Sequence, residues 1–379
     1  MSRSIALLSG KGGSGKTTLA LTLANMLSSC KLRVLLVDCD LVTNGATYFY
    51  EDRLNQSASI LSFDDLLYKT DGVKQSTPIK ISPYYDFIPS ILRVSEGTTI
   101  SRHFDIEIKK RFESIYHDMT KKYDAILFDC SAGYSEVLQY VVPLTDCNLV
   151  VLEADTISMA AMRSLYLKIG EILPNSRFYQ VFNKIRPEEV EVYSRKEGSF
   201  FTNIGAVTFD WSIREAFSMA SVPTVDNTGL EFGMQLYRIC STLFQGETYQ
   251  SKLNTYSLEL SLNKARVERD QTQIELINYR SDRQSWRDRR DALMYTLIPM
   301  FFLCVMCAFL LYSNHFESKV SLPLLVTVTV SLLISLFSYM QKQNRDNRER
   351  KMKLTAYSDR LDALKEKIEY LEQKINETK

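Results

Sequence analysis

The sequence predicts an α/β fold with a mostly parallel sheet flanked by helices, followed by an all-α region. Three observations support this prediction. A short apolar run at 5–8 precedes a glycine-rich loop and then a segment with a helical apolar face. Two further apolar runs, 33–40 and 123–133, carry aspartates toward their ends. After about Gln250 the composition shifts to long uncharged runs flanked by heptad patterns.

The glycine-rich loop is the most specific motif in the chain. Gly10 to Thr17 fits the phosphate-loop pattern G-x-x-x-x-G-K-[ST] at every fixed position. Glycines let the backbone present its N–H groups to phosphate oxygens, and the following helix N-terminus adds a positive dipole end. We expect Lys16 to reach the β- and γ-phosphates and the Thr17 hydroxyl to ligate Mg²⁺. The predicted nucleotide-binding residues of this loop are Gly12, Gly13, Ser14, Gly15, Lys16, Thr17 and Thr18.

Acidic residues follow the two other predicted strands. Asp38 and Asp40 close the run 33–40, and Asp129 lies in the run 123–133. In an open parallel sheet, ligands bind beyond the carboxyl ends of the strands, so these carboxylates should meet the phosphate loop. A single aspartate after a strand is more often a helix cap or a turn residue. Three such acidic positions beside a phosphate loop favour a binding site.

The motifs KGGSGKTT, VDCD and FDCSAG resemble the deviant Walker ATPases of the MinD/ParA family of P-loop NTPases, which bind ATP and Mg²⁺. The resemblance implies that Lys11 is the signature lysine, which reaches across a nucleotide-sandwiched homodimer to the partner's phosphates. It also implies that Asp40 orients the attacking water, that Asp38 lies near Mg²⁺ and that Asp129 is the Walker B carboxylate. The implied catalytic residues are Lys11, Lys16 and Asp40, and the implied metal-site residues are Thr17, Asp38 and Asp129.

The resemblance extends beyond the motifs, over about residues 1–246. YYDFIPSIL (84–92) resembles a family strand, and GAVTFDWSIREAFSMASVPTVD (205–226) resembles the last strand and the following helix. VFNKIRP (181–187) resembles the adenine-side segment, which makes Asn183 a candidate for contacting the base. The segment Val42 to Tyr50 has no clean match to the switch sequence of either subfamily.

Composition excludes some functions and favours others. The net charge of +1 gives no sign of bulk nucleic-acid binding. The seven cysteines are scattered, which together with an ATP site favours free thiols in a reducing compartment. The three histidines form no metal-ligand pattern.

Two uncharged apolar runs, 292–312 and 320–340, each have the length of about 20 residues that a membrane-spanning helix needs. A buried globular hairpin is the alternative. Basic residues precede the first run and follow the second, so the positive-inside rule places both flanks in the cytoplasm. The expected localisation is therefore the inner membrane, as a multi-pass protein with cytoplasmic N- and C-terminal regions and lipid contact.

The flanks of these runs carry helical repeats. Apolar residues from Leu354 to Ile375 recur at spacings of three and four, and a less regular grid runs from Leu253 to Ile277. We expect an antiparallel coiled-coil stalk within one chain; separate helices, or pairing between subunits, are the alternatives. The predicted regions are an ATPase domain (1–246), a cytoplasmic helix or coiled coil (247–291), transmembrane helix 1 (292–312), a short external loop (313–319), transmembrane helix 2 (320–340) and a cytoplasmic coiled-coil helix (341–379).

Together these features predict a membrane-anchored ATPase switch. It would bind and hydrolyse ATP in a homodimer and act on an unknown protein partner. Two alternatives stay open. A bacterial tyrosine kinase shares a related fold, but such kinases typically lack an equivalent of Lys11 and carry a terminal tyrosine cluster. A non-hydrolysing ATP-binding scaffold is disfavoured by Asp40. A DNA-partitioning ATPase is a further alternative, although a membrane anchor suits it poorly.

Overall fold

The structure is a computed structural model of the 379-residue chain. It describes residues 2–54, 60–69, 77–91, 105–172, 176–197, 200–221, 230–313 and 321–378, without many of the side chains between 282 and 343. The chain divides into two compact units. The first comprises Met1–Asn263 with Lys374–Lys379, and the second comprises Lys264–Gln373.

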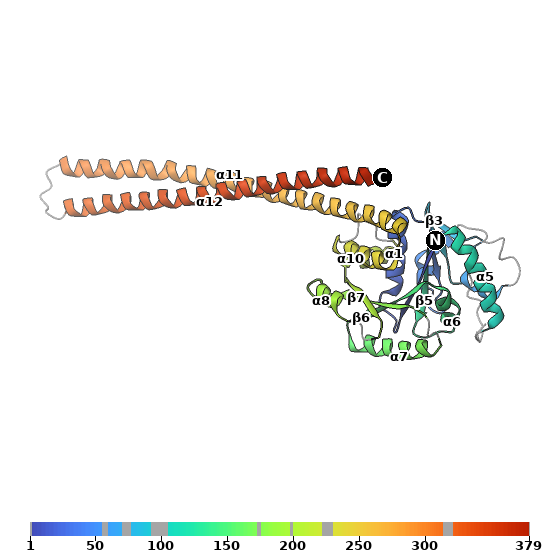
Figure 1. Ribbon diagram of the computed structural model, residues 1–379. Helices are drawn as coiled ribbons and strands as arrows, with labels where there is room; N and C mark the ends of the chain where they lie inside the picture. The colour runs from blue at the N-terminus through green and yellow to red at the C-terminus, as the bar shows by residue number, and fades with distance from the viewer. Residues whose placement is uncertain are drawn as a thin grey trace. The chain divides into compact units, whose positions relative to one another are not determined.

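An eight-stranded sheet forms the centre of the first unit (Figure 1). Its order is β3-β4-β2-β5-β1-β6-β7-β8, and all neighbours are parallel except the antiparallel pair β3 and β4. The predicted mostly parallel sheet is therefore confirmed. The strands are β1 (Arg3–Ser9), β2 (Val34–Asp38), β3 (Ile79–Ser82), β4 (Tyr85–Ile88), β5 (Ala125–Ala132), β6 (Cys147–Glu153), β7 (Phe178–Ile185) and β8 (Thr202–Thr208).

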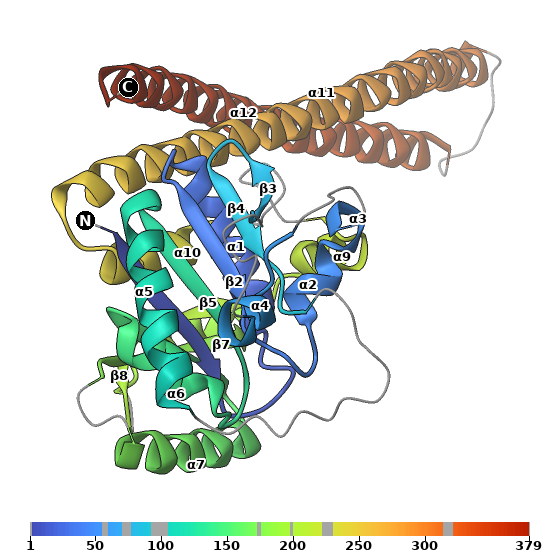
Figure 2. The ribbon, with the colours of Figure 1, turned by 90° about the vertical axis from the view of Figure 1, so that its right-hand side faces the viewer.

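Helices cover both faces of this sheet (Figure 2). One face packs against α1 and α10, and the other packs against α4, α5, α6 and α7. Among the described residues, the helices and 3₁₀ turns of the first unit are α1 (Lys16–Ser29), α2 (Gly45–Phe49), α3 (Glu51–Leu54), α4 (Phe63–Tyr68), α5 (Ile106–Lys122), α6 (Val137–Val141), η2 (Val142–Leu144), α7 (Thr156–Ile172), η3 (Pro187–Glu189), α8 (Val190–Arg195), α9 (Trp211–Ser218) and α10 (Leu230–Leu243).

The apolar run at the start of the chain is buried on both sides. Successive side chains of a strand point to opposite faces. Ile5 and Leu7 accordingly lie in the core beneath α1, whereas Ala6 and Leu8 lie in the core beneath α7. This explains why the strand reads as a continuous apolar run rather than an alternating one.

The predicted strands occur, with shifted ends. β2 ends at Asp38, so Asp40 lies in the loop beyond it. β5 continues past Asp129 to Ala132. In the pairing of β2 with β5, Asp38 lies directly opposite Asp129.

The first part of the long helix α11 (Glu247–Ser313) belongs to the first unit. Leu253, Tyr256 and Leu260, which the sequence places on a coiled-coil grid, are instead buried in the core that includes α1 and α10. The Tyr249 hydroxyl donates to the Asp124 carbonyl at 2.6 Å, and Lys252 Nζ donates to the Lys31 carbonyl at 2.9 Å. The expected grid is therefore wrong at these three positions, because their apolar side chains complete the sheet-side core.

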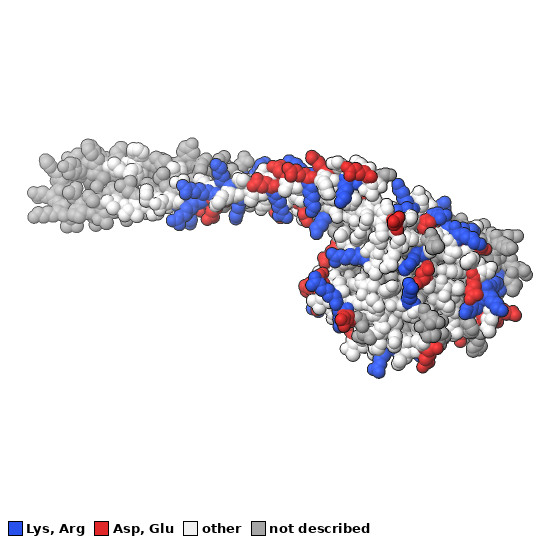
Figure 3. All heavy atoms as spheres, viewed as in Figure 1, with Lys and Arg blue, Asp and Glu red and all other residues white. Residues whose placement is uncertain are grey.

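The second unit is an antiparallel pair of helices, α11 and α12 (Ser321–Thr378). Arg266 forms an ion pair with Glu372 at 2.7 Å. Further along, the rings of Tyr279 and Tyr357 lie 6.1 Å apart. The contact further along α11 is made with a residue that comes earlier in α12. The two helices therefore run antiparallel to each other within one chain. Figure 3 shows that Lys, Arg, Asp and Glu side chains gather on the described part of this pair.

The predicted membrane hairpin is not supported. The two apolar runs lie within α11 and α12, apart from residue 320, which is outside the described residues, but no helix among the described residues is long and apolar enough to cross a membrane. A span needs about 20 largely apolar residues, and the described stretches of these helices are rich in charged side chains. The expected multi-pass inner-membrane localisation is therefore wrong. The predicted external loop (313–319) lies outside the described residues, apart from Ser313.

Candidate functional site

The glycine-rich loop joins β1 to α1 in the arrangement that the motif predicts. Gly13 has φ 81° and Gly15 has φ 85°, a left-handed conformation that residues with a Cβ rarely adopt. Gly10 lies against the backbone of α7, where an added Cβ would fall 2.5 Å from the Ala161 carbonyl carbon. The loop therefore needs its glycines both to turn and to fit beneath α7.

Lys16 meets Asp129 at the base of the loop. Its Nζ lies 2.5 Å from Asp129 Oδ1, and both side chains are buried. Burial alone would lower the pKa of Lys16, but the charge and the hydrogen bond of Asp129 outweigh it and raise that pKa. The ammonium group is thus kept charged at the place where phosphate charge is expected.

Asp38 lies beside this pair on the neighbouring strand and is fully buried. Its Oδ1 accepts from the Asp40 N–H at 3.0 Å, and its Oδ2 accepts from the Thr47 N–H at 2.8 Å and the Thr47 hydroxyl at 2.7 Å. Burial and the nearby negative charge of Asp129 raise the pKa of Asp38 to about 7. A cation beside this carboxyl group would therefore stabilise its ionised form.

Asp40 organises the turn after β2. Its Oδ1 accepts from the N–H groups of Val42 at 3.1 Å and Thr43 at 2.9 Å. Its Oδ2 accepts from the Thr43 hydroxyl at 2.5 Å. Thr43 and Thr47, which motif reasoning did not single out, thus hold both carboxylates of the VDCD segment.

The residues at this point fit a Mg²⁺ ion with its nucleotide. Hard oxygen donors suit this ion, and it usually takes one or two carboxylates together with substrate phosphates. Among the described residues, Asp129 Oδ2 and the hydroxyl of Ser14 are buried without a hydrogen-bond partner. The Thr17 hydroxyl is close by, since Lys16 Nζ lies 3.5 Å from it. These oxygens gather where the motif expects metal and phosphate.

Lys11, at the outer side of the loop, contacts two carboxylates of its own chain. Its Nζ lies 2.9 Å from Asp155 Oδ2 and 3.0 Å from Glu153 Oε2. Hydrogen bonds to Asp155 and then Glu153 raise the pKa of Lys11. Asp155 also caps α7, because its Oδ1 accepts from the Ser158 N–H at 2.7 Å.

Asn183, the candidate for contacting the base, reaches the phosphate loop. Its Nδ2 donates to the Ser14 carbonyl at 2.8 Å. The next residue, Lys184, donates to the Gly13 carbonyl and lies 2.6 Å from Glu153 Oε1. Glu153 therefore joins Lys11 to Lys184 through its two carboxylate oxygens.

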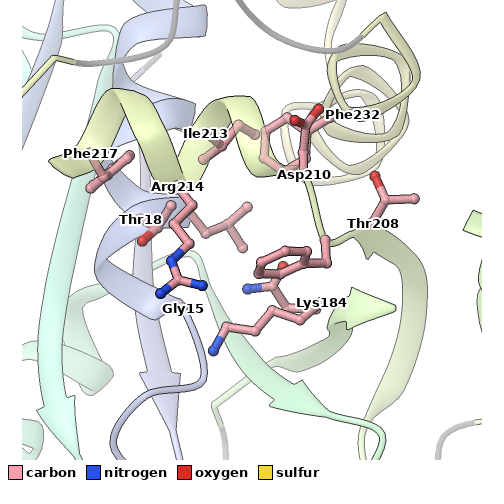
Figure 4. Close-up of a pocket in the computed structure, with 12 residues that line it drawn as sticks. Gly15, Thr18, Lys184, Thr208, Asp210, Ile213, Arg214, Phe217 and Phe232 are labelled. Carbon is pink, nitrogen blue, oxygen red and sulfur yellow. The ribbon is translucent and has the colours of Figure 1, made fainter. Parts of the chain in front are cut away.

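A pocket of about 330 Å³ lies beside Gly15 of the phosphate loop (Figure 4). Its apolar wall includes Leu19, Ile213 and Phe217, and Arg214 extends across it from α9. This combination of apolar walls and a few polar groups is typical of small-molecule sites, and it suits the flat ring and polar edges of a nucleotide base. The full lining is Gly15, Thr18, Leu19, Asn183, Lys184, Thr208, Phe209, Asp210, Ile213, Arg214, Phe217 and Phe232.

Several residues around the loop are not part of any motif recognised in the sequence. Glu153 and Asp155 follow the apolar run that becomes β6, which is the same strand-then-acid signal that marked Asp38 and Asp129. That signal could have identified them. Lys184 and Arg214 carry no comparable signal, because their position depends on how β7 and α9 fold toward the loop.

Comparisons with known proteins agree with this geometry. Residues 2–178 match the family model of an AAA domain. The chain is 25% identical over 196 residues to the septum site-determining protein MinD of Synechocystis sp., covering 51% of this chain and 68% of that protein. It is also 25% identical over 175 residues to the chromosome partitioning protein ParA of Caulobacter vibrioides, covering 45% of this chain and 63% of that protein.

A solved structure shares the fold. The MinC:MinD cell division protein complex of Aquifex aeolicus matches with a TM-score of 0.51 at 18% identity, covering 65% of this chain and 98% of that chain. At this identity the likeness concerns the fold alone. The family model, the two relatives and this shared fold agree that the chain resembles P-loop proteins of the MinD/ParA kind.

Proposed function

We propose that the chain is an ATP-dependent switch that binds ATP with Mg²⁺, closes as a nucleotide-sandwiched homodimer and opens after slow hydrolysis to ADP and phosphate. The two nucleotide states would differ in their affinity for a partner protein. The observation that carries the proposal is the buried contact of Lys16 with Asp129 beside Asp38, at the end of a complete phosphate loop.

The proposed roles follow from the position of each group. Lys16 and the N–H groups of Gly12, Gly13, Ser14, Gly15, Thr17 and Thr18 bind the phosphates. Thr17, Asp38 and Asp129 hold Mg²⁺, which neutralises phosphate charge when bound. Asp40 orients the attacking water, and Asn183 borders the base pocket.

Lys16 must leave Asp129 for a phosphate oxygen during binding. The exchange replaces one anionic partner by another, so the ammonium stays paired throughout. It also leaves Asp129 with two oxygens for the metal side of the site. Charge in the loop is thereby arranged before the nucleotide arrives, which is the condition for electrostatic stabilisation of phosphoryl transfer.

The dimer part of the proposal concerns Lys11. With its Nζ on Glu153 and Asp155, this lysine lies at the outer side of the loop rather than beside Asp129. We propose that it leaves these carboxylates to contact the nucleotide of the second subunit. Lys16 would then serve the nucleotide of its own chain.

Lys16→Ala should abolish ATP binding, because it removes the buried ammonium that faces the phosphates. Isothermal titration calorimetry of Mg-ATP into the full chain measures this directly. Lys31→Ala is the matched control, since Lys31 is an exposed lysine at the end of α1. We expect at least a 100-fold loss of affinity for Lys16→Ala, on the order of 3 kcal/mol, and none for the control. Unchanged affinity in Lys16→Ala would remove the assignment of the loop.

A further inference from the structure

Lys184 has a backbone conformation that is sterically unfavourable for a residue with a Cβ atom. Its φ is 59°, in the left-handed region that residues other than glycine rarely occupy. The pairing of β7 with β8 shows the cause. Phe182 lies opposite Ala206 but Ile185 lies opposite Thr208, so β7 carries one extra residue between them. Such a bulge turns a side chain in a new direction, and bulges recur beside functional sites.

The bulge directs two consecutive side chains onto the phosphate loop. Lys184 Nζ donates to the Gly13 carbonyl, and Asn183 Nδ2 donates to the Ser14 carbonyl. The approach is close, because a Cβ added to Gly15 would fall 2.3 Å from Asn183 Nδ2. Lys184 is further held by Glu153 Oε1 at 2.6 Å.

These contacts constrain where the loop's N–H groups point. A peptide unit is planar, with its C=O and N–H on opposite sides. Anchoring the carbonyls of Gly13 and Ser14 toward β7 therefore directs the N–H groups of Ser14 and Gly15 away from β7. Donors held in place before a ligand binds lose less freedom on binding, which raises affinity.

We propose that Lys184 is a positioning residue that anchors the phosphate loop from β7 and preorganises its N–H groups for phosphate. The strained backbone persists because it brings this side chain to the Gly13 carbonyl. The inference rests on the proposed function, since it assumes that the loop binds a nucleotide phosphate. It concerns the phosphates rather than the base, although Lys184 also borders the pocket in Figure 4.

Lys184→Gly tests the proposal, because glycine accepts the left-handed conformation while removing the anchor. Lys31→Gly is the matched control: Lys31 has φ 57° but makes its contacts at the end of α1. Binding of ATP, ADP and inorganic tripolyphosphate to the full chain would be measured by calorimetry. Melting temperatures without ligand would be measured in parallel.

We expect Lys184→Gly to weaken binding of all three ligands by a similar factor, about fivefold, as loss of one hydrogen bond predicts. Its ligand-free melting temperature should stay within about 2 °C of the wild type, because relief of backbone strain offsets the lost contacts. Lys31→Gly should leave all three affinities unchanged.

Three results would overturn the proposal. Unchanged affinities would mean that the anchor does not organise the loop. A loss for ATP and ADP but not for tripolyphosphate would make Lys184 a base contact instead. A fall of more than about 5 °C in the ligand-free melting temperature would give Lys184 a folding role. If the wild-type chain bound none of the three ligands, the proposed function itself would fail, which is a separate outcome.

Discussion

At the scale of single residues, the site contains more carboxylates than nearby ammonium groups. Asp129 has Lys16 as its partner, whereas the described hydrogen-bond donors to Asp38 are a hydroxyl and two N–H groups. Hydrogen bonds lower the pKa of Asp38 in part, but burial and the charge of Asp129 outweigh them. The unequal environments of two adjacent aspartates therefore leave one of them ready for a divalent cation.

This arrangement predicts a pH dependence of stability. The ordinary pKa of aspartate is about 4, and that of Asp38 is about 7 in the folded chain. Between these values the folded state holds the proton that the unfolded state has lost, so stability falls as the pH rises through this window and levels off above it.

Melting temperatures measured without nucleotide or Mg²⁺ from pH 5 to pH 8 would check this expectation. The wild-type chain should lose stability more steeply over this range than Asp38→Asn, whose side chain stays neutral. Asp105→Asn, at the exposed cap of α5, is the control and should follow the wild type. Equal slopes for the wild type and Asp38→Asn would contradict the raised pKa of Asp38.

At the scale of elements, apolar periodicity alone does not say which partner a helix face meets. Leu364, Ile368 and Leu371 of α12 are buried, as the heptad spacing suggests. On α11, however, Ile274 and Ile277 are more than half exposed. Thr272 and Leu276 are buried on the same helix instead. The stripe that contacts α12 is therefore rotated from the grid expected for α11.

Crosslinking tests this register. Arg266→Cys with Glu372→Cys should be joined within one chain by a short bifunctional thiol reagent, because the native side chains form an ion pair. Arg266→Cys with Tyr357→Cys is the control; the second position lies roughly 20 Å further along α12, at 1.5 Å per residue. Denaturing electrophoresis separates crosslinks within a chain from those between chains. If Arg266→Cys and Glu372→Cys joined only between chains, pairing within the chain would be refuted.

At the level of the whole molecule, the proposed dimer requires Lys11 to leave the carboxylates of its own chain. Lys11 has solvent access as well as its two carboxylate partners, with 26% of its side chain exposed. Ion pairs with solvent access are weakened by water, so a phosphate with higher charge can compete for this ammonium. The lysine is thus held in its own chain by contacts weak enough to exchange.

Lys11→Ala should retain ATP binding and lose the ATP-dependent dimer, because a phosphate charge would go uncompensated in the closed interface. Light scattering of the full chain with a non-hydrolysable ATP analogue would compare the masses of wild type and variant. Calorimetry on the same samples confirms nucleotide occupancy, and Lys31→Ala is the control. Dimerisation of Lys11→Ala as readily as the wild type would rule out a cross-subunit role for Lys11.

The class of sheet, the phosphate loop and the acidic positions near it could all be predicted from the sequence. These features depend on local order along the chain: a buried strand, glycines where the backbone must turn and acids where strands end. The sequence could not place Lys184 on the loop, because the contacts of this side chain arise from the bulge in β7 and from the adjacency of β6 and β7. It also misassigned Leu253, Tyr256 and Leu260, since an apolar helix face fits a sheet-side core as well as a second helix. The choice between such partners requires the folded structure, because burial depends on which surfaces the fold brings together.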